Sequence, residues 1–372
     1  RSWVAYHLSK GFATLYLFFD DAEDPGVAAV EALADARVFV FRRSPALLER
    51  QERTCAGFAR MGPHVADEVQ ARQCLNAEVA MQEAEAAGHR WLLHIDADEL
   101  FFTEAESVGA HFEALEADGV AQMTYVNHEA VPEAAHIGDF FREVTLFRRH
   151  HFEVPMTPAA AAAMTFWQRR TAHGQYMLAY DNGKSACRVG AGVRPENVHR
   201  WALPDGHNQC TALVDPRKLD MSNVRPCADP CILHFVTTGF EWLRAKYELL
   251  GGFPDAWFGG TLKIAPSFHL DARDVLRSGD DQVGFDFYVA QVMLGDREEA
   301  DRQVAAGTCF RCTSHVEVIE AATPGRPLAR PSPTVPLVVH TPKARQDAAG
   351  GAEDPTGQQR AWIIAQVAKT YL

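Results

Sequence analysis

The sequence predicts an α/β protein in which a layered, mainly parallel sheet is flanked by helices. Strand-like segments alternate with helical ones through the first half of the chain. The chain has 372 residues, of which 47% are hydrophobic, so it can bury a sizeable core. Alternation of strands and helices is typical of parallel sheets, because each helix returns the chain to the edge from which the strand began.

The expected strands are short apolar segments that turn residues delimit. They lie at 14–20, 37–41, 90–96, 120–126, 143–149, 185–189 and 231–235. An amphipathic helix opens the chain, and a long Ala/Glu-rich helix over about 64–87 ends at Gly88. Residues 150–182 are expected to form a loop with a helical patch, and the pattern after His234 becomes helical.

Composition divides the chain into three parts. Residues 1–250 are predicted to form the main domain, and 251–322 a helical extension that packs on it. Residues 323–372 are rich in Pro, Gly and Ala and are expected to be mostly tail or linker.

The charge balance excludes some classes of function. The formal charge is −13, from 49 acidic and 36 basic residues, which disfavours a nucleic-acid binder. A nucleotide ligand is not disfavoured, because a bound metal and a few local bases can balance its charge. No apolar run approaches the roughly 20 residues that a membrane helix needs.

Eight cysteines are present, and four of them suggest a thiolate zinc site: Cys227, Cys231, Cys309 and Cys312. The first pair is loosely spaced, and the second pair lacks a glycine-rich knuckle. Disulfides or plain buried thiols are therefore the preferred interpretation.

The segment "RWLLHIDADE" ends a buried strand in three acids, Asp96, Asp98 and Glu99. Residues i and i+2 of a strand point to one side, so Asp96 and Asp98 are expected to present two carboxylates together if the strand persists. Hard divalent cations such as Mg²⁺ and Mn²⁺ take such oxygen ligands. The simpler alternative is a solvated strand end with a helix cap.

A histidine and a lysine follow another predicted strand. His234 ends "ILHF" and is a candidate third metal ligand, because imidazole is acceptable to Mn²⁺. A packed, hydrogen-bonded histidine is the alternative. Lys246 lies on the helix that follows, where most lysines are merely solvated.

The turn signal Asp181-Asn182-Gly183 opens a strand that carries Lys184 and Arg188. These two cations share one strand face and are predicted to meet a phosphate, with His199 nearby. An exposed basic face that pairs with surface carboxylates is the alternative.

Further polar candidates lie near the first strand and on the long helix. Asp20 and Asp21 end the first strand, where acids contact a ribose or base, or cap a helix. Gln73 and Asn76 lie three residues apart on one helix face, which points either to solvent or into the same pocket.

Taken in order, the segments "WVAYHLSKGF", "LYLFFDD", "HRWLLHIDADELFF", "FREVTLFRR", "NGKSACRV" and "ILHF" resemble family-2-like glycosyltransferases, in the plant and algal group related to family-92 enzymes. The resemblance runs from Trp3 to about Tyr247. It implies a GT-A fold that moves a sugar from a nucleotide-diphosphate sugar to a glycan or other hydroxyl acceptor, in an inverting reaction.

The resemblance also implies roles for residues. Asp96 and Asp98 match the Asp-x-Asp pair that holds Mn²⁺ or Mg²⁺ against the donor diphosphate. His234 matches a late histidine that completes the metal site, and Asp20 and Asp21 match the position that contacts the nucleoside.

Two departures from the family pattern stand out. The first strand of the fold, which would precede Trp3, is missing. No unambiguous catalytic base is found, and Asp181 and then Asp286 are the candidates.

Two other functions use the same residues. One is a metal-dependent phosphohydrolase or nucleotidyltransferase, and the other is a degenerate transferase domain that binds glycans. For location, the resemblance and the eight cysteines predict a Golgi-lumenal domain with a membrane anchor upstream of Arg1. A cytoplasmic location is the alternative if the source is bacterial.

Overall fold

A seven-stranded sheet forms the main layer of the structure, a computed structural model that describes residues 1–104, 107–190, 192–211 and 229–323, with the backbone of 361–367. From edge to edge the strands are β11 (Asn208–Thr211), β5 (Val120–Tyr125), β8 (Lys184–Arg188), β3 (Trp91–Asp96), β16 (Ala361–Val367), β1 (Phe12–Phe19) and β2 (Val38–Arg42). Most neighbours are parallel, but β8 runs antiparallel to both β3 and β5. The mixed α/β prediction is confirmed, and the strand expected at 185–189 is the one that reverses.

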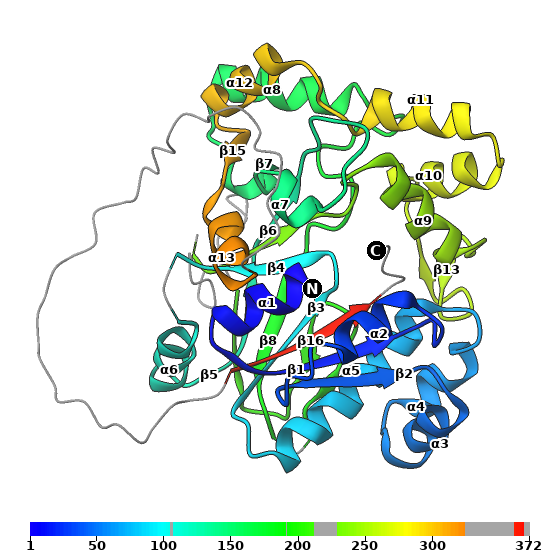
Figure 1. Cartoon of the computed structure of the whole chain (residues 1–372), viewed down its shortest axis with the longest axis vertical. Coiled ribbons are helices and arrows are strands. Elements are labelled where there is room, and N and C mark those ends of the chain that lie inside the picture. Colours follow the sequence, from blue (N-terminus) through cyan, green and yellow to red (C-terminus); the bar gives the residue numbers. More distant parts are fainter. Residues whose placement is uncertain (105–106, 191, 212–228, 324–360, 368–372) are drawn as a thin grey trace, which may run out of the picture.

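A second sheet of five strands lies above the first in Figure 1. Its strands, in order, are β15 (Cys309–Arg311), β7 (Leu146–Arg148), β6 (Asn127–Ala130), β12 (Cys231–His234) and β4 (Glu99–Phe102). Two hairpins complete the strands: β9 (Arg194–Pro195) with β10 (Trp201–Ala202), and β13 (Ala256–Trp257) with β14 (Leu262–Lys263). The sequence analysis did not predict strands β4 and β6, which have four residues each.

Helices cover both faces of the main sheet and build the C-terminal half. In the first half they are α1 (Ser2–Ser9), α2 (Pro25–Glu31), α3 (Pro45–Thr54), α4 (Phe58–Met61), the 3-10 turn Gly62–His64, α5 (Val69–Ala86), α6 (Gly109–Ala117), α7 (Phe140–Glu143), the 3-10 turn His151–Glu153 and α8 (Pro158–Gln168). In the second half they are α9 (Phe240–Leu250), α10 (Phe268–Arg277), α11 (Asp281–Gln291), α12 (Arg297–Ala306) and α13 (Ser314–Ala322). The helix expected over 64–87 therefore begins later, at Val69.

Strands β1 and β3 are apolar on both faces because helices cover both faces. In β1, Leu15 and Leu17 pack into the core on the side of α1 and α6, whereas Tyr16 and Phe18 pack against α5. The same alternation in β3 directs its odd-numbered residues toward α1 and leaves Asp96 on the side of α5. The register of β3 thus decides where its terminal carboxylate points.

The centre of the main sheet contains a strand that the sequence analysis did not expect. Residues 323–372 were predicted to be mostly tail or linker, but 361–367 form a strand. Strand β16 lies between β1 and β3 and is parallel to both, with Gln366 opposite Asp96. The segment 361–367 is short and lies within a Pro/Gly/Ala-rich stretch, so composition indicated a tail there instead of a strand.

Replacing Ala365 by proline tests the central position of β16. Proline removes a backbone donor, and a central strand has no solvent-facing side that tolerates the loss. We expect Ala365→Pro to lower the free energy of unfolding by at least about 1–3 kcal/mol, the penalty for one unpaired buried backbone group, or to prevent folding. Ala365→Ser keeps the donor and serves as the control in urea unfolding. Equal stability of both variants would contradict the central position.

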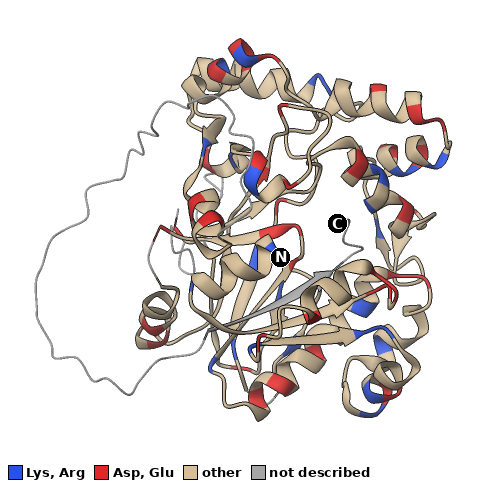
Figure 2. Cartoon of the chain, viewed as in Figure 1, with Lys and Arg blue, Asp and Glu red and all other residues tan. Residues whose placement is uncertain are grey.

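The cysteines, the membrane-helix prediction and the distribution of charge can also be compared with the structure. All seven described cysteines are free thiols, and Cys227 lies outside the described residues, so the four-thiolate zinc interpretation gains no support. Within the described part of the chain, no helix has the length and apolar content needed to cross a membrane. Acidic and basic residues are interspersed over the elements in Figure 2.

Four histidines are buried in the cores of the two sheets: His7, His94, His128 and His315. Burial lowers the pKa of each from 6.5 to about 3, so all four are neutral in the folded protein. His7 is typical: its Nδ1–H donates to the Trp3 carbonyl, and its Nε2 accepts from the backbone of Phe101.

These histidines predict a loss of stability in acid. Between about pH 6.5 and 3 the unfolded chain binds protons that the folded protein does not, so stability falls as the pH falls. Each histidine contributes a slope of about 1.4 kcal/mol per pH unit near pH 5. We expect urea unfolding between pH 7 and 5 to show uptake of several protons, and His7→Gln to reduce that uptake by about one. Stability that is independent of pH over this range would contradict the assignment.

Candidate functional site

A cavity of about 980 Å³ opens where β1, β2 and β3 end, between α5 on one side and α9 with the hairpin β13–β14 on the other. Many predicted site residues line it: Asp20, Asp21, Gln73, Asp96, Asp98, His199, His234 and Lys246. The carboxyl edge of parallel strands is where α/β sheets bind ligands. The sequence therefore predicted the location of this cavity from residues far apart in the chain.

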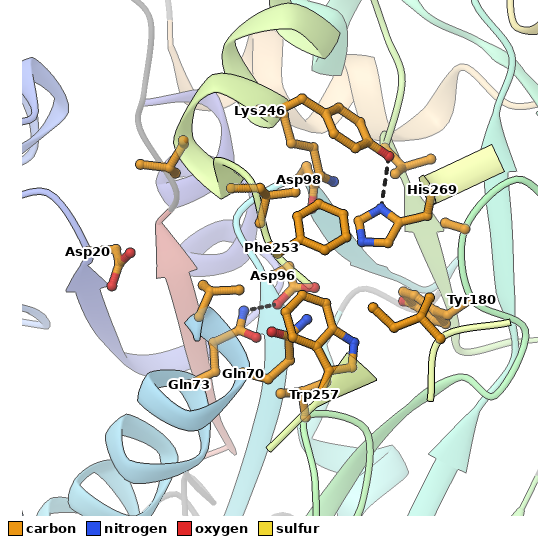
Figure 3. Close-up of a pocket in the computed structure, with 18 of the residues that line it drawn as sticks. Asp20, Gln70, Gln73, Asp96, Asp98, Tyr180, Lys246, Phe253, Trp257 and His269 are labelled. Carbon is orange, nitrogen blue, oxygen red and sulfur yellow. Dashed lines mark hydrogen bonds and ion pairs between the residues drawn. The ribbon is translucent and has the colours of Figure 1, made fainter. Parts of the chain in front are cut away.

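Asp96 and Asp98 come together through a turn. Strand β3 ends at Asp96 and β4 begins at Glu99, so the two acids flank a tight reversal instead of lying on one continuous strand. The turn is held at both ends, because the backbone N–H of Asp96 donates to Glu99 Oε2 at 2.6 Å and that of Phe235 donates to the Asp98 carbonyl at 2.7 Å. Both carboxylates face the cavity (Figure 3).

Each of the two carboxylates has its own lysine. Lys184 Nζ donates to Asp96 Oδ2 at 2.9 Å, and Lys246 Nζ donates to Asp98 Oδ2 at 2.8 Å. Burial is the largest single influence and would raise the pKa of both carboxyls, but the nearby positive groups together, the adjacent lysine first, lower it. Both acids are therefore ionised at neutral pH, and the two lysines balance their charge.

A third acid lies behind the pair and is fully buried. Tyr180 donates from its hydroxyl to Glu99 Oε1, and Lys184 Nζ lies 3.8 Å from Oε2. Burial raises the pKa of the Glu99 carboxyl well above its ordinary value, and the neighbouring aspartates add to the shift. Glu99 therefore connects the turn, Tyr180 and Lys184 in one network of hydrogen bonds and charges.

Asp98 and His234 have the geometry of two ligands of one divalent cation. His234 Nε2 lies 3.8 Å from Asp98 Oδ1, too far for a hydrogen bond but within the spacing of two atoms that each lie about 2.1 Å from a metal. Burial lowers the pKa of His234 to about 4, so its imidazole is neutral, as metal binding requires. The pair thus fits a hard or borderline divalent cation.

Asp96 fits direct metal binding less well. Its Oδ1 accepts from Gln73 Nε2 at 3.0 Å and its Oδ2 accepts from Lys184, so both oxygens already have donors. In the described part of the chain, no three His, Cys, Asp or Glu side chains form a complete metal-binding group. The predicted convergence of Asp96, Asp98 and His234 on one cation stays a prediction, and Asp98 with His234 is the pair whose spacing fits it best.

Two of the predicted phosphate contacts need correction. Lys184 is 0% exposed and does not line the cavity, so it supports Asp96 from behind and does not face a ligand. The Arg188 side chain leaves the same face of β8 as that of Lys184, but Arg188 lies four residues, about 13 Å, further along the strand. There it is 3.8 Å from Glu116, with half of its side chain exposed. Of the two cations paired with the acids, Lys246 is the one that faces the cavity.

The turn before Lys184 depends on glycine. Gly183 has φ +69°, and a Cβ there would lie 2.2 Å from the Tyr125 carbonyl oxygen. His199 donates from Nδ1 to the Gly183 carbonyl at 2.9 Å, and its ring packs on that of Tyr180 at 4.5 Å. The predicted turn signal therefore positions both Lys184 and His199.

Three other candidates lie outside the cavity. The Asp181 side chain is 60% exposed and lies 3.8 Å from His151, and Asp286 on α11 accepts from Gln282 at 2.9 Å. Neither predicted base lines the cavity. Asn76 does not line the cavity, and its side-chain oxygen accepts from Gln51 Nε2 at 2.8 Å.

Other lining residues were not predicted. Arg72 holds Asp20 in a two-point ion pair of 2.6 and 2.8 Å, and Gln70 lies one turn before Gln73 on α5. The helical spacing of Gln70 and Gln73 was a usable signal. No sequence signal pointed to Tyr180 and Trp257, because nothing in the residues around them indicates that they lie near the end of β3.

Lys184 and Arg188 offer a matched pair of substitutions on one strand. Removing a partner from a buried ion pair costs about 3–5 kcal/mol, and the partial exposure of Asp96 reduces this, so we expect Lys184→Met to destabilise by about 2 kcal/mol or more. Arg188→Ala removes an exposed pair and should change stability by less than about 1 kcal/mol. Urea unfolding measures both. Equal effects would contradict the buried pairing of Lys184 with Asp96.

Comparison with known proteins gives two relatives, both Arabidopsis thaliana proteins named glycosyltransferase-like. They are 28% and 29% identical to this chain over 264 residues, which is 68% of this chain. The matched region is 54% of one relative and 47% of the other, so the chain spans about half the length of these relatives. No protein-family model matches the chain, and no solved structure matches it. The two relatives support a relation to glycosyltransferases.

Proposed function

We propose that the chain is a glycosyltransferase domain of GT-A type that transfers a sugar from a nucleotide-diphosphate sugar to a hydroxyl acceptor. The observation that carries the proposal is the lysine-balanced pair Asp96 and Asp98 in a cavity at the carboxyl edge of the sheet. The names of the two relatives support the same reaction class. A cavity of about 980 Å³ is large enough for a nucleotide sugar and part of an acceptor.

In this reaction the bond between the anomeric carbon and the donor diphosphate breaks, and the acceptor oxygen bonds to that carbon. The nucleoside diphosphate leaves, and the acceptor proton passes to a base or to solvent. Charge develops on the leaving diphosphate, so a site that stabilises it lowers the barrier.

Asp98 and His234 would hold Mn²⁺ or Mg²⁺, and the bound cation would neutralise charge on the leaving diphosphate. Lys246 lines the same cavity. When a nucleotide sugar is bound, the Lys246 ammonium can donate to a phosphate oxygen instead of to Asp98. Gln73 and Lys184 fix the Asp96 carboxylate, and Asp20, held by Arg72, is the candidate contact for the nucleoside.

Two finer points stay proposals. The first is inversion at the anomeric carbon. Neither candidate base, Asp181 or Asp286, lines the cavity, and NMR of the product anomer distinguishes inversion from retention. A Golgi-lumenal location gains no disulfide in support, because the seven described cysteines are free.

Substitution of Asp98 by Asn tests the proposal, with Asp286→Asn as the control. Both changes replace one carboxylate by an amide, but Asp98 faces the cavity and Asp286 is exposed on α11. Transfer is measured with a panel of nucleotide sugars and Mn²⁺, and Mn²⁺ binding by electron paramagnetic resonance. We expect Asp98→Asn to lose about 100-fold or more in kcat/KM, and Mn²⁺ binding with it, while Asp286→Asn is unchanged.

The same assay separates the alternatives. A phosphohydrolase would release products at a rate that no acceptor changes. A nucleotidyltransferase would break the bond between the two phosphates of the donor and leave the sugar on a phosphate. A degenerate glycan-binding domain would release no products. Full transfer activity of Asp98→Asn would contradict the role given to the acidic pair.

A further inference from the structure

One wall of the cavity is aromatic and comes from the C-terminal half of the chain. Phe253, Trp257 and His269 line it. Phe253 stacks against both others, with ring centroids 5.2 Å from Trp257 and 4.5 Å from His269. In Figure 3, Asp20 lies well to the left of Asp96, whereas the aromatic side chains lie around Asp96 and toward its right. The two ends of the cavity therefore differ in chemistry.

The hairpin that carries Trp257 is held in a strained conformation. Phe258 has φ +52°, a conformation that bulky residues rarely adopt. The buried carboxylate of Glu68 accepts from the backbone N–H of Phe258 at 2.6 Å and of Gly259 at 3.2 Å. Arg273 donates to the Phe253 carbonyl at 2.7 Å on the other flank. These anchors fix Trp257 in the cavity wall.

Two polar groups in the cavity wall have no partner. The indole Nε1–H of Trp257 donates to none of the described residues, and Trp257 is 8% exposed, at the cavity. The side-chain oxygen of Gln70, on the facing helix α5, is buried without a hydrogen-bond partner. A buried acceptor left unpaired is unfavourable by about 1–3 kcal/mol, so the Gln70 oxygen is suited to a polar ligand, and the Trp257 N–H, which is not fully buried, can donate to the same ligand.

We propose that Trp257 and Gln70 form a binding subsite for a sugar ring of the acceptor. A pyranose has an apolar face of C–H groups that packs on an aromatic ring, and a rim of hydroxyls that both donate and accept hydrogen bonds. Trp257 offers the ring face and a donor, and Gln70 offers an acceptor. This inference rests on the proposed function for its assignment to the acceptor, but the binding of a sugar does not.

A sugar fits this subsite better than a purely apolar acceptor does. An apolar group would cover Trp257 but leave its Nε1–H and the Gln70 oxygen unpaired. Sites with buried polar groups reject ligands that lack the matching hydroxyl, because the unpaired groups carry the penalty.

The test measures binding of methyl glycosides of glucose, galactose, mannose and xylose by saturation-transfer NMR, with cyclohexanol as the apolar comparison. Trp257→Leu keeps an apolar side chain but removes the aromatic face and the donor. We expect this variant to weaken glycoside binding about tenfold or more, and Trp257→Phe to retain more of it. Leu262→Ala, an exposed position on the same hairpin, is the matched control and should bind as the unaltered protein does.

A second measurement uses the unaltered protein, so it does not depend on the folding of a variant. The indole N–H resonance that disappears in Trp257→Phe is assigned to Trp257, and it should shift when a bound glycoside is added. The inference is overturned if no glycoside binds, if cyclohexanol binds as well as the glycosides, or if binding leaves this resonance unchanged.

The binding experiment separates this inference from the proposed function. Glycoside binding that depends on Trp257 in a protein without transferase activity would support the subsite and contradict the function. Transfer with an acceptor KM that Trp257→Leu leaves unchanged would support the function and overturn the subsite.

Discussion

Two ionised carboxylates at the end of a buried strand require nearby cations, and the structure around the cavity follows from this requirement. Asp96 and Asp98 are balanced by Lys184 and Lys246, which come from a different strand and a different helix. Bringing these four side chains together requires the end of β3, the start of β8 and the middle of α9 to meet beside the cavity. Without the lysines, the desolvation of two carboxylates would oppose folding of the turn.

The two lysines have different roles because they differ in exposure. Lys184 is enclosed behind Asp96 and is shared with Glu99, so it sets the position and charge of the acidic turn. Lys246 faces the cavity and pairs with Asp98, the carboxylate nearest to His234. A ligand that brings its own negative charge, or a cation between Asp98 and His234, can replace this exposed contact. The buried pair provides a fixed support, and the exposed pair provides the exchangeable one.

How much of the fold could be predicted from sequence depended on how local the signal was. The strands near residues 14–20 and 90–96 were predicted because a fully apolar run at a sheet centre is visible in the sequence, and the edge strand near 37–41 because of its short apolar run. Strand β16 was missed because its pairing with residues more than 260 positions earlier leaves no trace in composition.

The site residues also divide into those with a local sequence signal and those without one. Asp96, Asp98, His234 and Lys246 were found because each follows or ends a predicted strand. Arg188 was wrongly placed because a shared strand face does not say at which end of the strand a residue lies, and β8 runs antiparallel to β3. Trp257 was missed because residues after 250 were expected to be helical, whereas a hairpin returns them to the cavity.

The central claim is that this cavity binds the diphosphate of a nucleotide through Lys246 and a cation between Asp98 and His234. Isothermal titration calorimetry of nucleosides, nucleoside monophosphates and nucleoside diphosphates tests it most directly. The account predicts that a diphosphate binds at least about tenfold more tightly than the matching monophosphate, about 1.4 kcal/mol, and that Mn²⁺ increases this difference. Equal affinity for both nucleotides, with and without Mn²⁺, would contradict it.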